Sequence, residues 1–194
     1  MHRIQKLLGD EVAPDISWSG SLTVAQRQDA GKALRNVTPR SSHAAWTPPA
    51  VRCDPIELLE TQAQTRISEL ATIRYGRMRA SPFAFLLGAE VVMAHDLAST
   101  STTGLTVQLR GDRHLANFGI YASPERISVF DSIDFDESLP GPWEWDLKRL
   151  AASFLVAARS FGLSLADARG IVLRLVASYR TQMQAFAQQT TLAV

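Results

Sequence analysis

The sequence predicts an α+β fold, a mostly helical lobe that carries a small β element. Apolar residues recur at helical spacing along much of its second half, which predicts amphipathic helices. Residues 105–109 and 126–130 instead alternate apolar and polar side chains, which is typical of short strands. Between these strands, residues 121–125 have the composition of a turn. A polar loop at residues 111–119 follows the first strand, so we expect the β element to carry a functional loop.

The chain is expected to divide near residue 52. Residues 1–52 are predicted to be an N-terminal arm or linker that is partly flexible, because residues 12–52 are rich in proline, serine and threonine and show little periodicity. Residues 53–194 are predicted to form the folded lobe. Its first helix is expected to start after Asp54, an N-cap that is followed by proline at the first helical position.

Four helices are expected in the lobe. The first follows Asp54, and the second covers about residues 83–97. The third runs from about Asp146 to Gly162, and the fourth follows a capping pattern at Ser164. Their apolar stripes are Ile56, Leu59, Ala63, Ile67 and Leu70 in the first helix, Leu147, Leu150, Ala151, Phe154, Leu155 and Ala158 in the third, and Ala168, Ile171, Val172, Leu175, Val176, Tyr179, Met183 and Phe186 in the fourth.

The polar loop reads Gly-Asp-Arg-His-Leu-Ala-Asn-Phe-Gly, and an acidic cluster, Ile-Asp-Phe-Asp-Glu, follows at residues 133–137. Phosphoryl transfer in kinase-like folds uses a base and two metal ligands of these residue types. We predict Asp112 as the catalytic base, and Asn117 and Asp134 as ligands of Mg²⁺. A carboxylate and an amide oxygen suit Mg²⁺, which keeps its other positions for water and phosphate oxygens.

Plainer interpretations stay open for these residues. Asp112 and Asn117 could only satisfy the backbone of a turn. His114 could approach a phosphate, or it could hold the loop in shape by bonding to backbone carbonyls. Asp136 and Glu137 could lie in a second shell around the metal, or they could form a solvated acidic turn.

These motifs resemble two groups of proteins. The loop and the following Ile-Asp-Phe are similar to the catalytic and metal-binding segments of aminoglycoside phosphotransferases and related small-molecule kinases. A closer resemblance, over roughly residues 74–185, is to the uncharacterised bacterial family called domain of unknown function 2252. It rests on Ser-Pro-Phe-Ala-Phe at residues 81–85, the polar loop, the acidic cluster, and Leu-Pro-Gly-Pro-Trp-Glu-Trp-Asp-Leu-Lys-Arg-Leu at residues 139–150. The resemblance implies a kinase-like large lobe built around the catalytic loop.

The resemblance gives further residues a role. Asp146 is similar to the buried aspartate that anchors the catalytic loop in kinase-like folds, and the alternative is a plain helix N-cap. Independently of the resemblance, the basic run formed by the arginines at positions 74, 77 and 79 could bind phosphate or form a solvated face. Leu87 stands where the family usually has arginine, so any anion contact of that arginine is absent here. Ile133 replaces a usual asparagine, and Arg110 a usual small residue.

One part of a kinase is not found in the sequence. There is no glycine-rich phosphate hairpin, and none of the lysines Lys6, Lys32 and Lys148 lies on a predicted strand. We therefore expect the nucleotide-clamping small lobe not to be present and the chain to be truncated. The chain alone should then bind ATP weakly or not at all, and it should expose apolar surface where a second lobe would dock. The cofactor-binding residues stay unknown.

Composition excludes several classes of protein. A net charge of +1 and a pI near 8.0 give no strong field toward nucleic acid or a membrane surface. Cys53 is the only cysteine, so neither an internal disulfide nor a cysteine-based zinc site can form. Residues 1–11 do not have the pattern of a signal peptide, and the apolar stretch at residues 83–94 is too short to span a membrane. A cytoplasmic protein is the expectation.

Three functions are consistent with these features. The first is an ATP- and Mg²⁺-dependent phosphotransferase that acts on a hydroxyl of a small molecule, or the catalytic-loop part of such an enzyme. The alternative is a kinase-like module that binds nucleotide, metal or a partner protein without turnover. The third is a metal-dependent phosphohydrolase that uses the same carboxylates. The substrate and the oligomeric state stay open.

Overall fold

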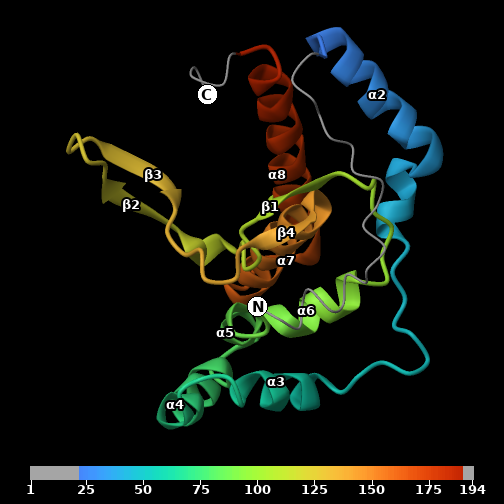
Figure 1. Cartoon of the computed structure of the whole chain (residues 1–194). Coiled ribbons are helices and arrows are strands. Elements are labelled where there is room, and N and C mark those ends of the chain that lie inside the picture. The colour runs from blue at the N-terminus through green and yellow to red at the C-terminus, as the bar shows by residue number, and fades with distance from the viewer. Residues whose placement is uncertain (1–21, 190–194) are drawn as a thin grey trace.

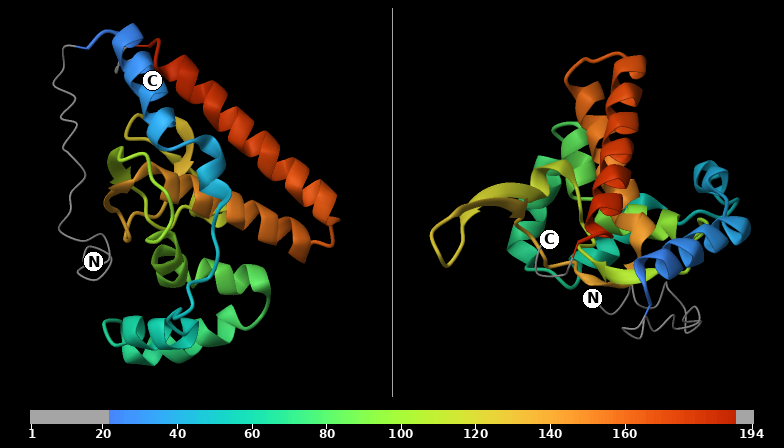
Figure 2. Two further views of the ribbon diagram at one scale, coloured as in Figure 1. Left: turned by 90° about the vertical axis from the view of Figure 1, so that its right-hand side faces the viewer. Right: turned by 90° about the horizontal axis from the view of Figure 1, so that it is seen from above.

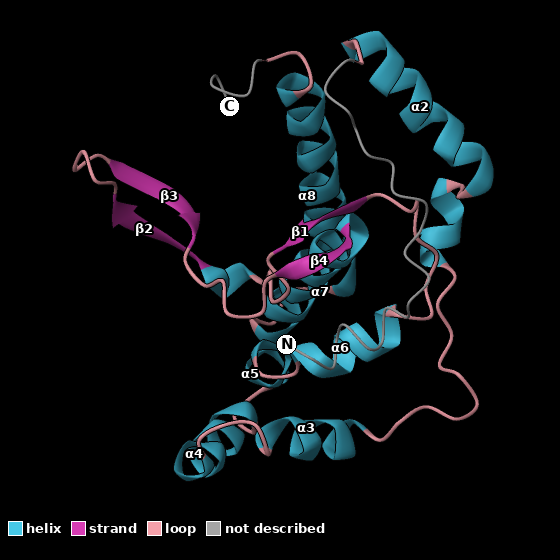
Figure 3. Cartoon of the chain, in the orientation of Figure 1, coloured by secondary structure: helices cyan, strands magenta, loops and turns pink. Residues whose placement is uncertain are grey.

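The computed structural model describes residues 22–189. Within this range the chain forms seven α-helices and two small antiparallel sheets, so the predicted α+β class is confirmed (Figure 1). Helices make up most of the secondary structure, and the strands are confined to the middle of the chain (Figure 3). No helix in the described part is both long and apolar enough to cross a membrane.

Four helices lie between residue 54 and the first strand. They are α3 (Pro55–Ala63), α4 (Ser68–Met78), α5 (Pro82–Leu87) and α6 (Glu90–Leu97). The predicted cap at Asp54 is confirmed, since its side chain accepts a hydrogen bond from the Ile56 backbone N–H at 2.8 Å. The predicted stripe through Leu70 does not lie on one helix, because α3 ends at Ala63. Ile67 and Leu70 are more than half exposed.

The single helix predicted for residues 83–97 is also wrong. It is broken at Gly88 and Ala89 into α5 and α6. The backbone of Gly88 packs against the side chain of Met78, and a Cβ atom there would lie only 2.7 Å from the Met78 sulfur. The break lets Ala89 and Val92 join Met78 and Leu59 in a buried cluster between α3, α4 and α6.

The strands pair differently from the prediction. The predicted strands correspond to β1 (Thr106–Leu109) and β3 (Ser128–Ser132), but these lie in separate sheets. β1 pairs with β4 (Leu139–Pro142), and β3 pairs with β2 (Phe118–Ala122). β4 was not predicted, because its sequence contains two prolines, which disfavour a strand. They are tolerated because β4 has only one neighbour, so a missing N–H can face away from the ladder.

The longest helices follow the strands. They are α7 (Trp143–Ser160) and α8 (Leu165–Phe186), which pack against each other. α7 begins three residues before the predicted start, and it also contacts α5, α6, β1 and the polar loop, which makes it the central element (Figure 1). The predicted ends are confirmed, because Gly162 has φ +82° after α7 and Ser164 caps α8.

Two parts of the chain extend away from this centre. One is α2 (Val24–Val37), a helix that the sequence pattern of the arm did not predict; residues 1–21 of the arm lie outside the described residues. α2 starts with a capping box between Thr23 and Gln26 and buries none of its residues. The other part is the β2–β3 hairpin, which projects beyond the helices (Figure 2). Ile120 and Phe130 on this hairpin are about three-quarters exposed.

Candidate functional site

The polar loop is fixed to one face of α7. The carboxylate of Asp146 accepts hydrogen bonds from the backbone N–H groups of Arg110 and Gly111, at 2.9 and 3.1 Å. One turn further, Arg149 donates to the side chain of Asp112. After another turn, the Ser153 hydroxyl accepts a hydrogen bond from the Leu115 N–H at 2.9 Å. Asp146, Arg149 and Ser153 are buried and spaced at helical intervals, so a single stripe of α7 holds the loop.

Asp112 is held by two partners. Its Oδ1 accepts from Nε and Nη2 of Arg149 at 3.0 and 2.8 Å, while its Oδ2 lies 3.3 Å from His114 Nε2. Burial alone would raise the pKa of the Asp112 carboxyl, but the hydrogen bond to His114 and the charge of Arg149 outweigh burial and lower that pKa below its usual value. Asp112 is therefore an ionised carboxylate in a fixed orientation.

Asn117 is also bonded to Asp112, but through the backbone. Its side-chain Nδ2 donates to the backbone carbonyl of Asp112 at 2.7 Å. Because the amide nitrogen is used inside the loop, the amide oxygen is the atom left for a ligand, and no described protein group donates to it. His114 is 5 % exposed, and its Nδ1 lacks a hydrogen-bond partner among the described residues.

The acidic segment, residues 133–137, packs directly on the polar loop. The Ile133 N–H donates to the Asn117 carbonyl at 3.1 Å. Gly111 has φ +79°, and a Cβ atom there would lie 2.0 Å from the Glu137 carbonyl oxygen. At Gly119 a Cβ atom would lie 3.1 Å from the side chain of Ile133. The two glycines that bound the loop therefore give the acidic segment room to approach.

Within that segment the two aspartates differ from the glutamate in exposure. Asp134 and Asp136 are exposed, and Asp134 Oδ1 accepts a hydrogen bond from the Asp136 N–H at 3.2 Å. Glu137 is half-buried and forms an ion pair with Arg66 at 3.2 Å. Burial and the charge of Glu90 raise the pKa of Glu137 above its usual value, although the charge of Arg66 opposes this shift.

A pocket of about 200 Å³ lies where the loop and the acidic segment meet. It brings together the predicted base and the two predicted metal ligands, as well as His114 and Asp136. Its lining residues are Arg66, Arg74, Leu87, Glu90, Arg110, Asp112, His114, Asn117, Asp134, Asp136 and Glu137. Asp146 lies beneath the loop and is not part of the lining; burial raises the pKa of its carboxyl, against the effect of the two backbone N–H groups.

The donor set of the pocket suits a hard divalent cation. Five carboxylates and three guanidinium groups line it, so its net charge is negative. No three His, Cys, Asp or Glu side chains among the described residues form a ready cage for a metal. Asn117 and Asp134 both line the pocket and carry the amide and carboxylate oxygens that Mg²⁺ accepts when water and phosphate oxygens complete its octahedron.

Sequence reasoning missed two residues that shape this site, Arg149 and Ser153. The sequence pattern of α7 predicted only an apolar stripe on this helix. The signal lay in the spacing, because Asp146, Arg149 and Ser153 repeat at intervals of three and four along one face of a helix that also carries an apolar stripe. Of the three arginines considered for phosphate binding, only Arg74 lines the pocket, whereas those at positions 77 and 79 are exposed.

Comparison with known proteins shows the family of this chain. No curated protein and no solved structure matches it. The profile of a bacterial family does match, over residues 66–194, and this range contains every residue that lines the pocket. The match covers more than half of the sequence, and the chain therefore belongs to the family described as "Uncharacterized protein conserved in bacteria (DUF2252)".

Proposed function

We propose that this protein is a Mg²⁺-dependent phosphotransferase of the kinase-like type, which transfers a phosphoryl group from ATP to a hydroxyl of a small molecule. One observation carries the proposal. Asp112, Asn117 and Asp134 line a single pocket although Asp134 is 22 positions from Asp112 in the sequence. Three residues with the chemical types of a base and two metal ligands are thereby placed around one space.

Two of these residues would hold the cation. Asp134 offers an exposed carboxylate, and Asn117 offers an amide oxygen whose nitrogen is already bonded to the Asp112 carbonyl. The bound cation would supply positive charge against the charge that develops on phosphate oxygens during transfer. The excess of carboxylates in the pocket supports this assignment, because a pocket of that charge attracts a divalent cation.

Asp112 would orient the acceptor hydroxyl and take its proton. In phosphoryl transfer the proton leaves late, so an ionised carboxylate with a low pKa can serve. The contacts with Arg149 and His114 keep Asp112 ionised and fix the direction of its free lone pairs. Fixed geometry is worth much in such reactions, since positioning supplies most of the rate enhancement.

A second function, a kinase-like module that binds nucleotide or a partner without turnover, is favoured by the same ion pair. Both donors of Arg149 that reach Asp112 bind Oδ1, and His114 occupies the space beside Oδ2. A carboxylate with both oxygens engaged is a weaker base than a free one. The described residues also contain no lysine on a strand, since Lys32 lies on α2 and Lys148 on α7.

Transfer of radiolabelled phosphate separates these functions. The protein is incubated with Mg²⁺, γ-labelled ATP and a panel of amino-sugars, polyols and nucleosides, and the labelled products are resolved. We expect label in a hydroxyl-bearing acceptor, and its loss in Asp112→Asn, while Asp131→Asn, outside the pocket, retains it. Release of labelled phosphate to water with no acceptor product would favour a phosphohydrolase. ATP binding without either product would favour the binding module.

A further inference from the structure

Three arginines line the pocket together with the carboxylates, and the proposed chemistry assigns them no role. We propose that Arg66, Arg74 and Arg110 form a subsite for a phosphate group. The proposal rests on the proposed function in that it completes the same pocket. It adds the recognition of the anion, whereas Asn117 and Asp134 account only for the cation.

Arg74 is held in place by the buried carboxylate of Glu90. Its Nη2 donates to both oxygens of Glu90 at 3.0 Å and to the carbonyl of Gly88 at 2.7 Å. Glu90 is 6 % exposed and also accepts from Gln62 and Arg66. These contacts use only one of the three nitrogens of Arg74, so Nε and Nη1 have no acceptor among the described residues.

Arg66 repeats this arrangement beside it. Its Nη2 donates to Glu90 at 2.9 Å and to Glu137 at 3.2 Å, and its other two nitrogens have no described acceptor. The side chain is 36 % exposed, so it can turn toward a ligand. Arg66 and Arg74 therefore share one buried carboxylate and present several unused N–H groups at the same pocket.

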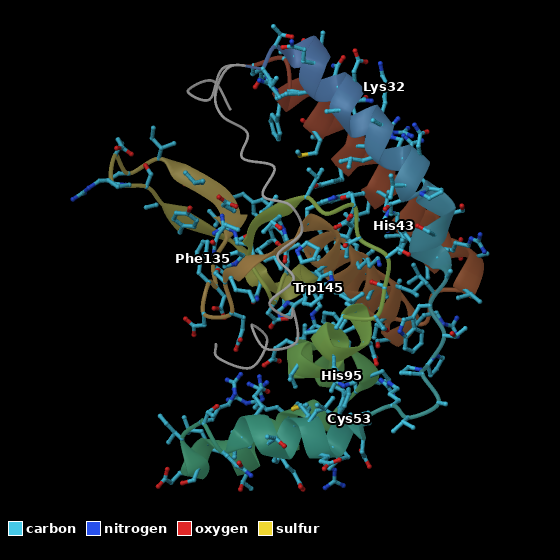
Figure 4. The ribbon with its side chains drawn as sticks, turned by 45° about the vertical axis from the view of Figure 1, so that its right-hand side comes forward. Lys32, His43, Cys53, His95, Phe135 and Trp145 are labelled. Atoms are coloured by element: carbon cyan, nitrogen blue, oxygen red, sulfur yellow. The ribbon has the colours of Figure 1, made fainter. Side chains whose placement is uncertain are left out.

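Arg110 is the third arginine of the set, and it lies between β1 and the polar loop. Its guanidinium carbon lies 4.2 Å from the centre of the Phe135 ring, so the ring contacts the group without using one of its hydrogen bonds. Phe135 is labelled in Figure 4. The backbone N–H of Arg110 is bound by Asp146, so the residue starts from a fixed point. None of the N–H groups of its guanidinium has an acceptor among the described residues.

This chemistry favours phosphate over other ligands. Guanidinium groups donate in forks, and a phosphate offers several oxygens that can accept from more than one fork. The unused nitrogens of Arg74 and Arg110 are not among the buried unpartnered atoms, and Arg66 is exposed, so these donors can reach a ligand that enters the pocket. A metal held by Asn117 and Asp134 would offset the carboxylates of the pocket, so we expect phosphate to bind together with Mg²⁺.

Calorimetric titration with inorganic pyrophosphate in the presence of Mg²⁺ tests the proposal. We expect Arg66→Gln to weaken the binding of pyrophosphate about tenfold or more, because charge-assisted hydrogen bonds are lost. Arg66→Lys should recover part of it. Glu137→Gln should strengthen it, since the carboxylate that competes for Arg66 becomes neutral. Arg77→Gln is the matched control, because Arg77 is on α4 outside the pocket. Equal affinities of Arg66→Gln and Arg77→Gln, or no binding by the wild type, would overturn the subsite.

Two further arms identify the source of the phosphate and separate the two proposals. ADP and glycerol 3-phosphate are titrated in the same way: tighter binding of ADP assigns the subsite to the nucleotide, and tighter binding of glycerol 3-phosphate assigns it to a phosphorylated substrate. Asp134→Asn tests the metal independently. Loss of affinity in Arg66→Gln but not in Asp134→Asn would support the subsite and contradict the metal site, and the reverse result would overturn the subsite alone.

Discussion

The polar loop and the acidic segment supply carboxylates to the same pocket, but they are held in opposite ways. Residues 110–117 are tied to the buried face of α7 by side chains at three successive turns. Residues 133–137 lie at the surface, and they meet the loop through a backbone hydrogen bond and two close contacts at glycines. Under the proposed function, the base therefore lies in the more firmly held segment, and the carboxylate ligand of the cation lies in the exposed one.

The two regions also differ in how the fold shifts the pKa of their carboxyl groups. Arg149 and His114 hold the pKa of Asp112 below its usual value after burial is offset, so the folded protein stabilises the ionised form. Burial and the charge of Glu90 raise the pKa of Glu137, so the folded protein disfavours its ionised form. The negative charge of Asp112 is already balanced by Arg149 and His114, so it needs no bound cation. The carboxylates of the acidic segment would be stabilised most by one.

The largest expected effect is on the anchor of the loop. Arg149→Ala leaves the carboxylate of Asp112 without its buried partner, and breaking such a pair costs about 3–5 kcal/mol of unfolding free energy. Urea denaturation measures the loss. Arg159→Ala, at the exposed end of the same helix, should cost less than about 1 kcal/mol. Similar losses in the two variants would show that α7 does not hold the loop through Arg149.

A smaller effect is expected at the junction of the two regions. Gly111→Ala forces alanine into φ +79° and brings its Cβ against the Glu137 carbonyl, which should cost about 2 kcal/mol or more. Gly76→Ala is the control, since Gly76 lies inside α4 with open space around it, and there alanine should stabilise by about 0.5–1 kcal/mol. The account predicts opposite signs in thermal or urea unfolding, and a harmless Gly111→Ala would contradict the close junction.

The smallest effect concerns pH. Because the pKa of Glu137 is raised above 4.5 in the folded protein, the native state binds more protons than the unfolded chain just above that value. Stability should therefore fall as the pH rises through this window and then level off. The unfolding free energy measured from about pH 4 to about pH 7 should show this fall in the wild type and a smaller one in Glu137→Gln. Identical profiles would mean that Glu137 does not have a raised pKa.

The comparison of the two regions also shows which features were predictable. Caps at Asp54 and Ser164 are local, because they involve residues two or three positions apart, and both were predicted. The identity of the pocket residues followed from the chemical types in the polar loop and the acidic segment. No local pattern predicts how closely these two segments pack against each other, although Gly111 and Gly119 at the loop ends are the residues that permit it.

Long-range features explain the remaining errors. The pairing of β1 with β4 joins residues 30 to 36 positions apart, and the prolines at positions 140 and 142 oppose a strand on local grounds. The break at Gly88 depends on the approach of Met78 from another helix. The polar stripe on α7 is covered by the loop and, at Arg149, also by α5 and α6, so apolar periodicity could not identify Arg149 or Ser153.

Binding of Mn²⁺ shows most directly whether the pocket holds a Mg²⁺ site, since Mn²⁺ can replace Mg²⁺ and is detected by electron paramagnetic resonance. The account predicts one site in the wild type, weakened about tenfold or more in Asp134→Asn, because the loss of a ligand should cost at least as much as the loss of a supporting group. Asp134 is exposed, and among the described residues its side chain bonds only to the Asp136 N–H, so the fold should be unchanged. Asp131→Asn, an exposed aspartate outside the pocket, should bind Mn²⁺ as the wild type does. Equal affinities of the two variants, or no bound Mn²⁺ in the wild type, would contradict the site.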